Sequence, residues 1–175
     1  FKEEFVREQT DMPLLVVEST GKFLREKDLK SGGRQDIFYV WDTATGTIKE
    51  APRKTLALNG LAPALNGTHE VDSLQGKIKV KPVMEVLASH LDRNFTPAQA
   101  SKPTGVSPQV IEQLAHEIAA AKGVVNISSA NWGKHYHGDL IERAMLLIFA
   151  LCGHMGRKGA TFSAFPMMGL DTSIG

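Results

Sequence analysis

The chain has 175 residues, of which 42% are hydrophobic and 22% are charged, a composition typical of a globular protein with a real core. Its formal net charge of +1 gives no strong attraction to nucleic acid or to an anionic membrane. The single cysteine, Cys152, excludes an internal disulfide and a cysteine-only metal or iron–sulfur site. No window approaches the ~18 apolar residues of a membrane-spanning helix, so we expect no direct membrane span.

The two ends of the sequence indicate a piece of a longer polypeptide. The chain starts at Phe1, without an initiator methionine or a signal-peptide pattern, and residues 171–175 look like the middle of a loop. We therefore expect part of the chemistry to depend on groups outside these residues.

Residues 1–81 are predicted to form a region rich in β-hairpins. A helical turn or two is expected within residues 1–10, before a short strand at 14–17. Runs of strand-forming residues around turn signals then indicate two hairpins, at 37–49 and at 68–81. The lysines that alternate along the last of these strands are expected to protect a free sheet edge.

Residues 82–175 are predicted to form an α/β segment. From Pro82 the hydrophobic period changes from two to about 3.6, so we place the domain boundary between residues 81 and 82. Thr96, followed by Pro97 and Gln99, is a typical N-terminal cap of a short helix. A longer helix then leads into a strand.

The stretch 123–159 is predicted to form that strand, a polar loop, a helix and a glycine-rich turn. The strand is β-branched, and residues 140–151 carry only two charges, so both elements are expected to be buried. Asp139 is expected to cap the helix with Glu142 reaching back, and Gly153 is expected to end it.

The polar loop 128–137 is the predicted ligand site, because open α/β sheets bind ligands where a strand ends before a helix. His135 and His137 could share a metal, with His154 or Asp139 as a third ligand. That spacing matches no known metal site, so we favour hydrogen bonding by these histidines over metal binding.

A nucleotide or phosphate is the second candidate ligand. The loop opens a helix whose N-terminus attracts anions, Lys134 adds a cation, and Trp132 could stack on a planar ring. The chain contains neither a dinucleotide-binding fingerprint nor a P-loop. The turn 153–159, with Arg157 and Lys158, could also wrap an anion, but an exposed turn after a helix explains its glycines more simply.

The most specific motif lies in residues 131–160, which read NWGKHYHGDLIERAMLLIFALCGHMGRKGA. This stretch resembles one in the molybdopterin oxidoreductases of the dimethyl-sulfoxide-reductase superfamily, where a leucine- and alanine-rich helix precedes the pattern G-N-x-G-x-x-G. Here Gly153, Gly156 and Gly159 take the glycine positions. His154 stands where asparagine is usual in the family.

Upstream parts of the chain agree with this resemblance. Residues 95–100, 104–106 and 110–118 are similar to the family patterns Y-T-P-E-x-A, T-G-V and I-x-x-L-A-x-x-x-A. Residues 5–15, 23–25 and 39–42 look like the branch that contains nitrate and selenate reductases and ethylbenzene-type dehydrogenases. The resemblance covers most of the chain.

The resemblance implies an internal segment of a large, multidomain α/β catalytic subunit that performs two-electron oxygen-atom or hydroxyl transfer on a small-molecule substrate, often in anaerobic respiration. Such subunits hold molybdenum in two pyranopterin guanine dinucleotides and usually carry an iron–sulfur cluster near the N-terminus. The cluster and the metal ligand are expected outside this chain, so the isolated segment is expected to be inactive. An iron–sulfur electron-transfer subunit is the implied partner, in the periplasm or cytoplasm of a prokaryote.

In members of the family, residues at the matching motif positions contact the pterin cofactor. The resemblance therefore implies such contacts for the polar loop and for one later glycine. The residues expected to bind the cofactor are Ala130, Asn131, Trp132, Gly133, Lys134, His135, His137 and Gly169. They would contribute one wall of the site. The resemblance assigns neither a catalytic residue nor a metal ligand to this chain, and Cys152 does not match a metal-binding position.

Two other functions stay open at this point. A stand-alone α/β module could use the same loop to bind a nucleotide or another anion. Alternatively, the chain could be a subunit-interaction domain whose hairpins dock a partner.

Overall fold

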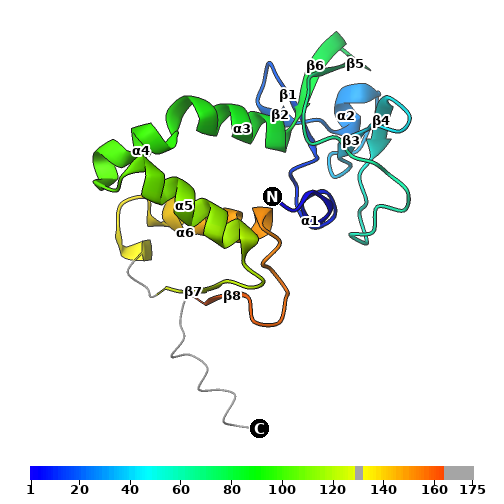
Figure 1. The fold of residues 1–175 in the computed structure, drawn as a ribbon. Helices are drawn as coiled ribbons and strands as arrows, with labels where there is room; N and C mark the ends of the chain where they lie inside the picture. Colours follow the sequence, from blue (N-terminus) through cyan, green and yellow to red (C-terminus); the bar gives the residue numbers. More distant parts are fainter. Residues whose placement is uncertain (129–131, 164–175) are drawn as a thin grey trace. The chain divides into compact units, whose positions relative to one another are not determined.

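The residues that the computed structural model describes are 1–128 and 132–163 (Figure 1). The chain separates in space into two units, one of Phe1–Phe5 with Pro108–Gly175 and the other of Val6–Ser107. The boundary that we expect between residues 81 and 82 follows the change from strands to helices, and it stays a prediction.

A four-stranded antiparallel sheet lies in the unit Val6–Ser107. Its strands are arranged in the order β2 (Lys22–Phe23), β1 (Leu15–Val17), β6 (Gly76–Pro82) and β5 (His69–Ser73). The strands β5 and β6 form the hairpin predicted at 68–81, with Val71 opposite Ile78. The strand predicted at 14–17 is β1, which pairs with both β2 and β6.

The lysines of β6 do not protect a sheet edge. Because β6 lies between β1 and β5, the prediction of a free edge at this strand is wrong. Lys77 lies opposite Asp72 and Lys79 lies opposite Glu70, and all four residues are exposed. The lysines therefore face opposite charges across the strands, an arrangement that stabilises a solvent-facing sheet surface.

The first predicted hairpin is formed by β3 (Tyr39–Asp42) and β4 (Thr47–Glu50). The buried side chain of Asp42 fixes its turn, since Oδ2 accepts from the Thr45 hydroxyl at 2.7 Å and Oδ1 accepts from the Ala62 amide at 2.8 Å. These hydrogen bonds stabilise the charged carboxylate and lower the pKa of Asp42 below its ordinary value.

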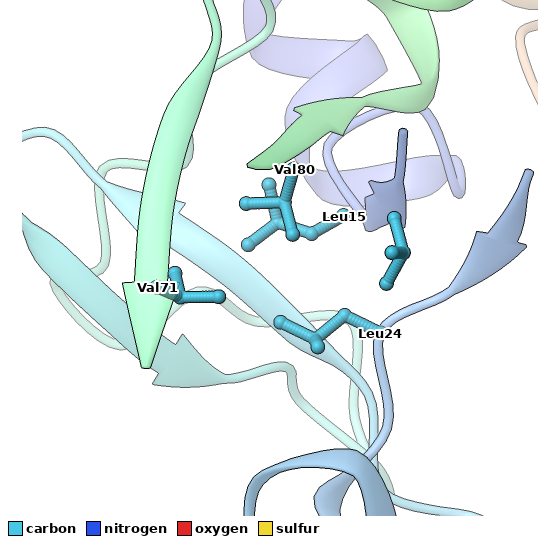
Figure 2. Close-up of a cluster of buried hydrophobic side chains, with 5 residues drawn as sticks. Leu15, Leu24, Val71 and Val80 are labelled. Carbon is cyan, nitrogen blue, oxygen red and sulfur yellow. The ribbon is translucent and has the colours of Figure 1, made fainter. Parts of the chain in front are cut away.

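The core of this unit is a cluster of buried aliphatic side chains from different elements. Its members are Leu15, Val17, Leu24, Val71 and Val80. Figure 2 shows four of them pointing toward one another from separate segments of the chain. Trp41 packs against the cluster and stacks on His69, with 4.1 Å between the ring centroids.

The first four helices are α1 (Glu3–Gln9), α2 (Glu26–Leu29), α3 (Val83–Asn94) and α4 (Pro97–Thr104). The predicted cap of α4 is confirmed. The Gln99 amide donates to Thr96 Oγ1 at 3.3 Å, and the Thr96 amide donates to Gln99 Oε1 at 2.9 Å. Local sequence therefore fixes where this helix begins.

The other unit contains a strand–loop–helix–strand arrangement. Its elements are α5 (Pro108–Ala120), β7 (Val125–Ile127), the 3-10 helix η1 (Trp132–Lys134), α6 (Gly138–Leu151) and β8 (Thr161–Ser163). The strands β7 and β8 pair in parallel, and α6 lies in the crossover between them. The predicted mixed α/β fold, with hairpins first and a β-loop-α unit later, is confirmed. The strand β8 has no counterpart among the predicted elements.

The predicted burial of β7 and α6 is wrong for this chain. Val125 is 51% exposed and Ile127 is 70% exposed. In α6 only Gly138 and Phe149 are buried. The described residues supply no layer that covers the remaining apolar surface of these elements. Within the described ranges, neither α6 nor any other helix is long and apolar enough to cross a membrane.

Candidate functional site

The polar loop follows β7 at the carboxyl end of the parallel pair. Of the residues expected to bind a cofactor, the structure describes Trp132, Gly133, Lys134, His135 and His137. The other three, Ala130, Asn131 and Gly169, lie outside the described residues. The described part of the loop is therefore the segment 132–137.

Backbone hydrogen bonds fold this loop against the start of α6. The His135 amide donates to the Trp132 carbonyl at 3.3 Å, and the Gly138 amide donates to the His135 carbonyl at 2.9 Å. A Cβ atom at residue 138 would lie 2.0 Å from the Trp132 carbonyl oxygen, so this closure requires glycine. The close approach of the loop backbone therefore explains why residue 138 is a glycine.

The side chains of the loop face solvent. Lys134, His135 and His137 are exposed, Trp132 is 38% exposed and Tyr136 is 90% exposed. The Tyr136 and His137 rings are in contact, with 3.9 Å between their centroids. An ammonium group, two imidazoles and an indole are therefore available to donate to anionic oxygens and to stack on a planar ring.

The predicted cap of α6 is wrong. His137, and not Asp139, occupies the N-cap position, in the left-handed conformation with φ 56° and without a side-chain cap hydrogen bond. Asp139 lies in the first turn, where its carboxylate is 4.0 Å from Arg143 Nε. The tight closure at Gly138 makes this residue the first of the helix, two residues earlier than the sequence pattern indicates, so Asp139 is already helical.

The hypothetical metal site at His135 and His137 has no third ligand among the described residues. His154 is completely buried, and its Nε2 lies 2.9 Å from the carbonyl oxygen of Ile118. His154 is therefore engaged away from His135 and His137, which are exposed in the loop. Among residues 1–128 and 132–163, no three His, Cys, Asp or Glu side chains come together as a metal site.

The glycine-rich turn after α6 is confirmed. Gly153, Gly156 and Gly159 have φ values of 66°, 69° and 75°, a region that side chains disfavour. Gly123 closes the other side, because a Cβ atom there would lie 2.7 Å from the Gly159 carbonyl oxygen. Arg157 lies exposed in the turn, as does its neighbour Lys158, so anion binding by this turn stays a hypothesis.

Two features of this region were not anticipated from sequence: the strand β8 and the burial of His154. Thr161 and Phe162 are strand formers after a glycine turn, which is a weak signal for β8. His154 directly follows a helix-ending glycine, a position whose side chain commonly packs against the last helical turn. That position was a usable signal for its burial.

The fold and the loop define an α/β protein with a β-loop-α unit, and comparisons identify the family. Chlorate reductase subunit alpha from Ideonella dechloratans is 39% identical in an alignment of 171 positions that covers 94% of this chain. Dimethylsulfide dehydrogenase subunit alpha from Rhodovulum sulfidophilum is 36% identical in an alignment of 179 positions, gaps included, that covers 99% of the chain. Perchlorate reductase subunit alpha from Dechloromonas aromatica is 35% identical in an alignment of 180 positions, gaps included, that covers 88% of the chain. No family model matches.

The chain spans only 18%, 18% and 19% of the length of these three relatives, respectively. It belongs to the dimethyl-sulfoxide-reductase family, and it corresponds to a segment of the alpha subunits of these enzymes. The resemblance inferred from the motifs is thereby confirmed.

Proposed function

We propose that this chain is a segment of the catalytic subunit of a molybdenum oxidoreductase, and that its polar loop contributes one wall of the site for a pyranopterin guanine dinucleotide. The observation that carries the proposal is the position of the segment 132–137, at the carboxyl end of a parallel strand. The names of the relatives, two reductases and a dehydrogenase, support an oxidoreductase.

The donors of the loop fit this cofactor chemically. A pyranopterin guanine dinucleotide presents a pyrophosphate, a guanine and a pterin edge that is rich in donors and acceptors. The Lys134 ammonium would pair with a phosphate oxygen, His135 and His137 would hydrogen-bond to phosphate or to the pterin edge, and Trp132 would stack on a ring. When bound, the cofactor would supply the metal for two-electron oxygen-atom or hydroxyl transfer, while the loop binds and orients it.

Several elements of this function would come from outside the described residues. Ala130, Asn131 and Gly169 are proposed as further cofactor contacts. The iron–sulfur cluster and the metal ligand are proposed to lie in other parts of the subunit, so we expect this segment alone to be inactive. An iron–sulfur electron-transfer subunit remains a proposed partner. A stand-alone module is not favoured, because most of the chain aligns within much longer alpha subunits.

The exposed apolar surface supports the proposal that other parts of the same subunit pack on this segment. Leu114 of α5 is 55% exposed, and Val125 and Ile127 of β7 are 51% and 70% exposed. A parallel pair of strands normally lies inside a sheet that is covered on both faces. We propose that the rest of the catalytic subunit covers these residues.

The proposal is tested in the full-length subunit by substituting Lys134→Ala and His137→Ala. Molybdenum and the guanine nucleotide released on hydrolysis are measured per mole of purified protein. We expect several-fold less of both, because two donors to the cofactor are lost. Matched controls are Lys102→Ala and His116→Ala, which remove the same groups from exposed positions on α4 and α5. Their cofactor content should equal that of the unmodified subunit.

Two results would contradict the proposal. A full-length subunit that contains neither molybdenum nor tungsten would refute the assignment to this class of enzymes. Equal losses of guanine nucleotide in the loop variants and in the controls would refute a specific role of the loop.

A further inference from the structure

The backbone of His154 ends α6 in a Schellman motif. The His154 amide donates to the Phe149 carbonyl at 2.8 Å, and the Gly153 amide donates to the Ala150 carbonyl at 3.2 Å. Gly153 has the φ value of 66° that this motif requires. The His154 ring then packs edge-on against Phe149, with 6.1 Å between the centroids. This residue therefore has a fixed backbone and a fixed ring position.

The side chain of His154 contacts a second helix end. Its Nε2 lies 2.9 Å from the carbonyl oxygen of Ile118, which belongs to the last turn of α5. Carbonyl groups in the last turn of a helix lack partners within that helix. Because a carbonyl oxygen only accepts, Nε2 must carry the hydrogen in this contact. Nδ1 is buried and has no partner in the part of the chain that the structure describes. The contact therefore requires a hydrogen on Nε2.

The two helix ends that meet at His154 lead into the two parallel strands. Four residues separate the last residue of α5 from the first of β7, and α6 continues through the glycine turn into β8. The Thr161 amide donates to the Val124 carbonyl at 3.1 Å where the strands start. Phe149 extends the connection, since its ring also packs edge-on against Phe162 of β8, at 6.1 Å between centroids. A shift at His154 would therefore be transmitted to both strands.

We infer that His154 is a positioning residue that joins the C-terminal ends of α5 and α6 and thereby sets the register of β7 against β8. The carboxyl end of β7 leads into the polar loop, so His154 also determines where that loop begins. The effect on strand register stands on the geometry alone. Any effect on cofactor content rests on the proposed function.

A pair of amide substitutions tests this inference in the full-length subunit. In His154→Gln the amide nitrogen is as many bonds from Cβ as Nε2 is in histidine, so it can still donate to Ile118. In His154→Asn the amide nitrogen is one bond closer to Cβ and cannot reach without a backbone shift. His154→Ala removes the donor and the ring. All three variants keep the backbone hydrogen bonds of the Schellman motif.

Amide hydrogen exchange of residues 124–128 and 161–163 is the measurement, with the hairpin 69–82 as the internal reference. We expect exchange about tenfold faster in the Asn and Ala variants and within about twofold of the unmodified subunit in the Gln variant, because one buried hydrogen bond is lost or kept. Guanine nucleotide content is measured on the same samples.

The inference is overturned if the Asn and Ala variants exchange as slowly as the unmodified subunit, or if the Gln variant exchanges as fast as the Asn variant. Rescue by Gln alone supports it, because Gln keeps a donor at the position of Nε2 and Asn does not. Fast exchange in the Asn variant with unchanged guanine nucleotide supports the positioning role and counts against the proposed function.

Discussion

The start of α6 approaches the loop so closely that a Cβ atom at Gly138 would lie 2.0 Å from the carbonyl oxygen of Trp132. The Gly138 amide meanwhile donates to the His135 carbonyl at 2.9 Å. The loop can therefore close on the helix only while residue 138 lacks a side chain. This contact makes the geometry of the proposed cofactor wall sensitive to a single methyl group.

Gly138→Ala is expected to open the loop. The added methyl cannot be accommodated against backbone atoms, so we expect a loss of about 1–3 kcal/mol in local stability. Faster amide exchange at His135 and at residue 138 would report it. Gly133→Ala is the matched control, because among residues 1–128 and 132–163 a Cβ atom there would meet only Glu142 Oε1, at 4.0 Å. Equal exchange in the two variants would contradict the steric explanation.

The sequence correctly predicted the elements that are held by interactions between residues close together in the chain. The cap of α4 depends on Thr96 and Gln99, which are three residues apart, and the structure forms both of its hydrogen bonds. The hairpins follow from alternating strand formers around turns. Gly153 has the conformation expected of a helix-ending glycine. In each case the interacting groups are near in sequence, so their residue types suffice.

The features that the sequence did not predict depend on distant groups. The contact of His154 with Ile118 joins residues that are 36 positions apart. The strand β8 has three residues and forms by pairing with β7 across α6. Burial was predicted for Ile127 because its strand contains β-branched residues. An apolar residue is buried only where another element packs on it, and the described residues provide no element that covers Ile127. Sequence patterns alone cannot identify these partners.

Asp42→Asn is expected to change the response of the chain to acid. The Thr45 hydroxyl and the Ala62 amide stabilise the carboxylate and lower the pKa of Asp42 in the folded state. A lowered pKa stabilises the fold at pH values above the ordinary carboxyl range, and this contribution is lost as the pH falls through the folded-state pKa. Unfolding of the variant, measured by denaturant titration at several pH values, should depend less on pH below about 4.

Asp92→Asn serves as the control for this experiment. Asp92 is exposed on α3, and its replacement removes the same charge without removing the turn contacts of Asp42. We expect the pH dependence of this control to match that of the unmodified chain. If the two variants respond alike to acid, the hydrogen bonds of Asp42 do not cause the effect.

Leu15→Ala is expected to destabilise the unit Val6–Ser107 strongly. The side chain of Leu15 is completely buried in the aliphatic cluster, so truncation leaves a cavity and should cost about 2–5 kcal/mol in the free energy of unfolding. Leu74→Ala removes the same atoms from a side chain that is 58% exposed, and it should cost less than about 0.5 kcal/mol. Denaturant titration of the two variants compares them. Similar losses in both would mean that the cluster is not the stabilising core.

Ile127→Ser distinguishes the chain by itself from the same residues within the full-length subunit. Ile127 is 70% exposed here, so we expect the 175-residue chain to lose less than about 0.5 kcal/mol of stability. If the rest of the subunit covers β7, the same change should cost the full-length protein about 1–3 kcal/mol and lower its thermal midpoint, because a covered apolar side chain is replaced by a hydroxyl. Ile37→Ser, at a position that is 6% exposed, should destabilise both forms. An Ile127 variant that is harmless in both contexts would show that this face of β7 stays exposed to solvent.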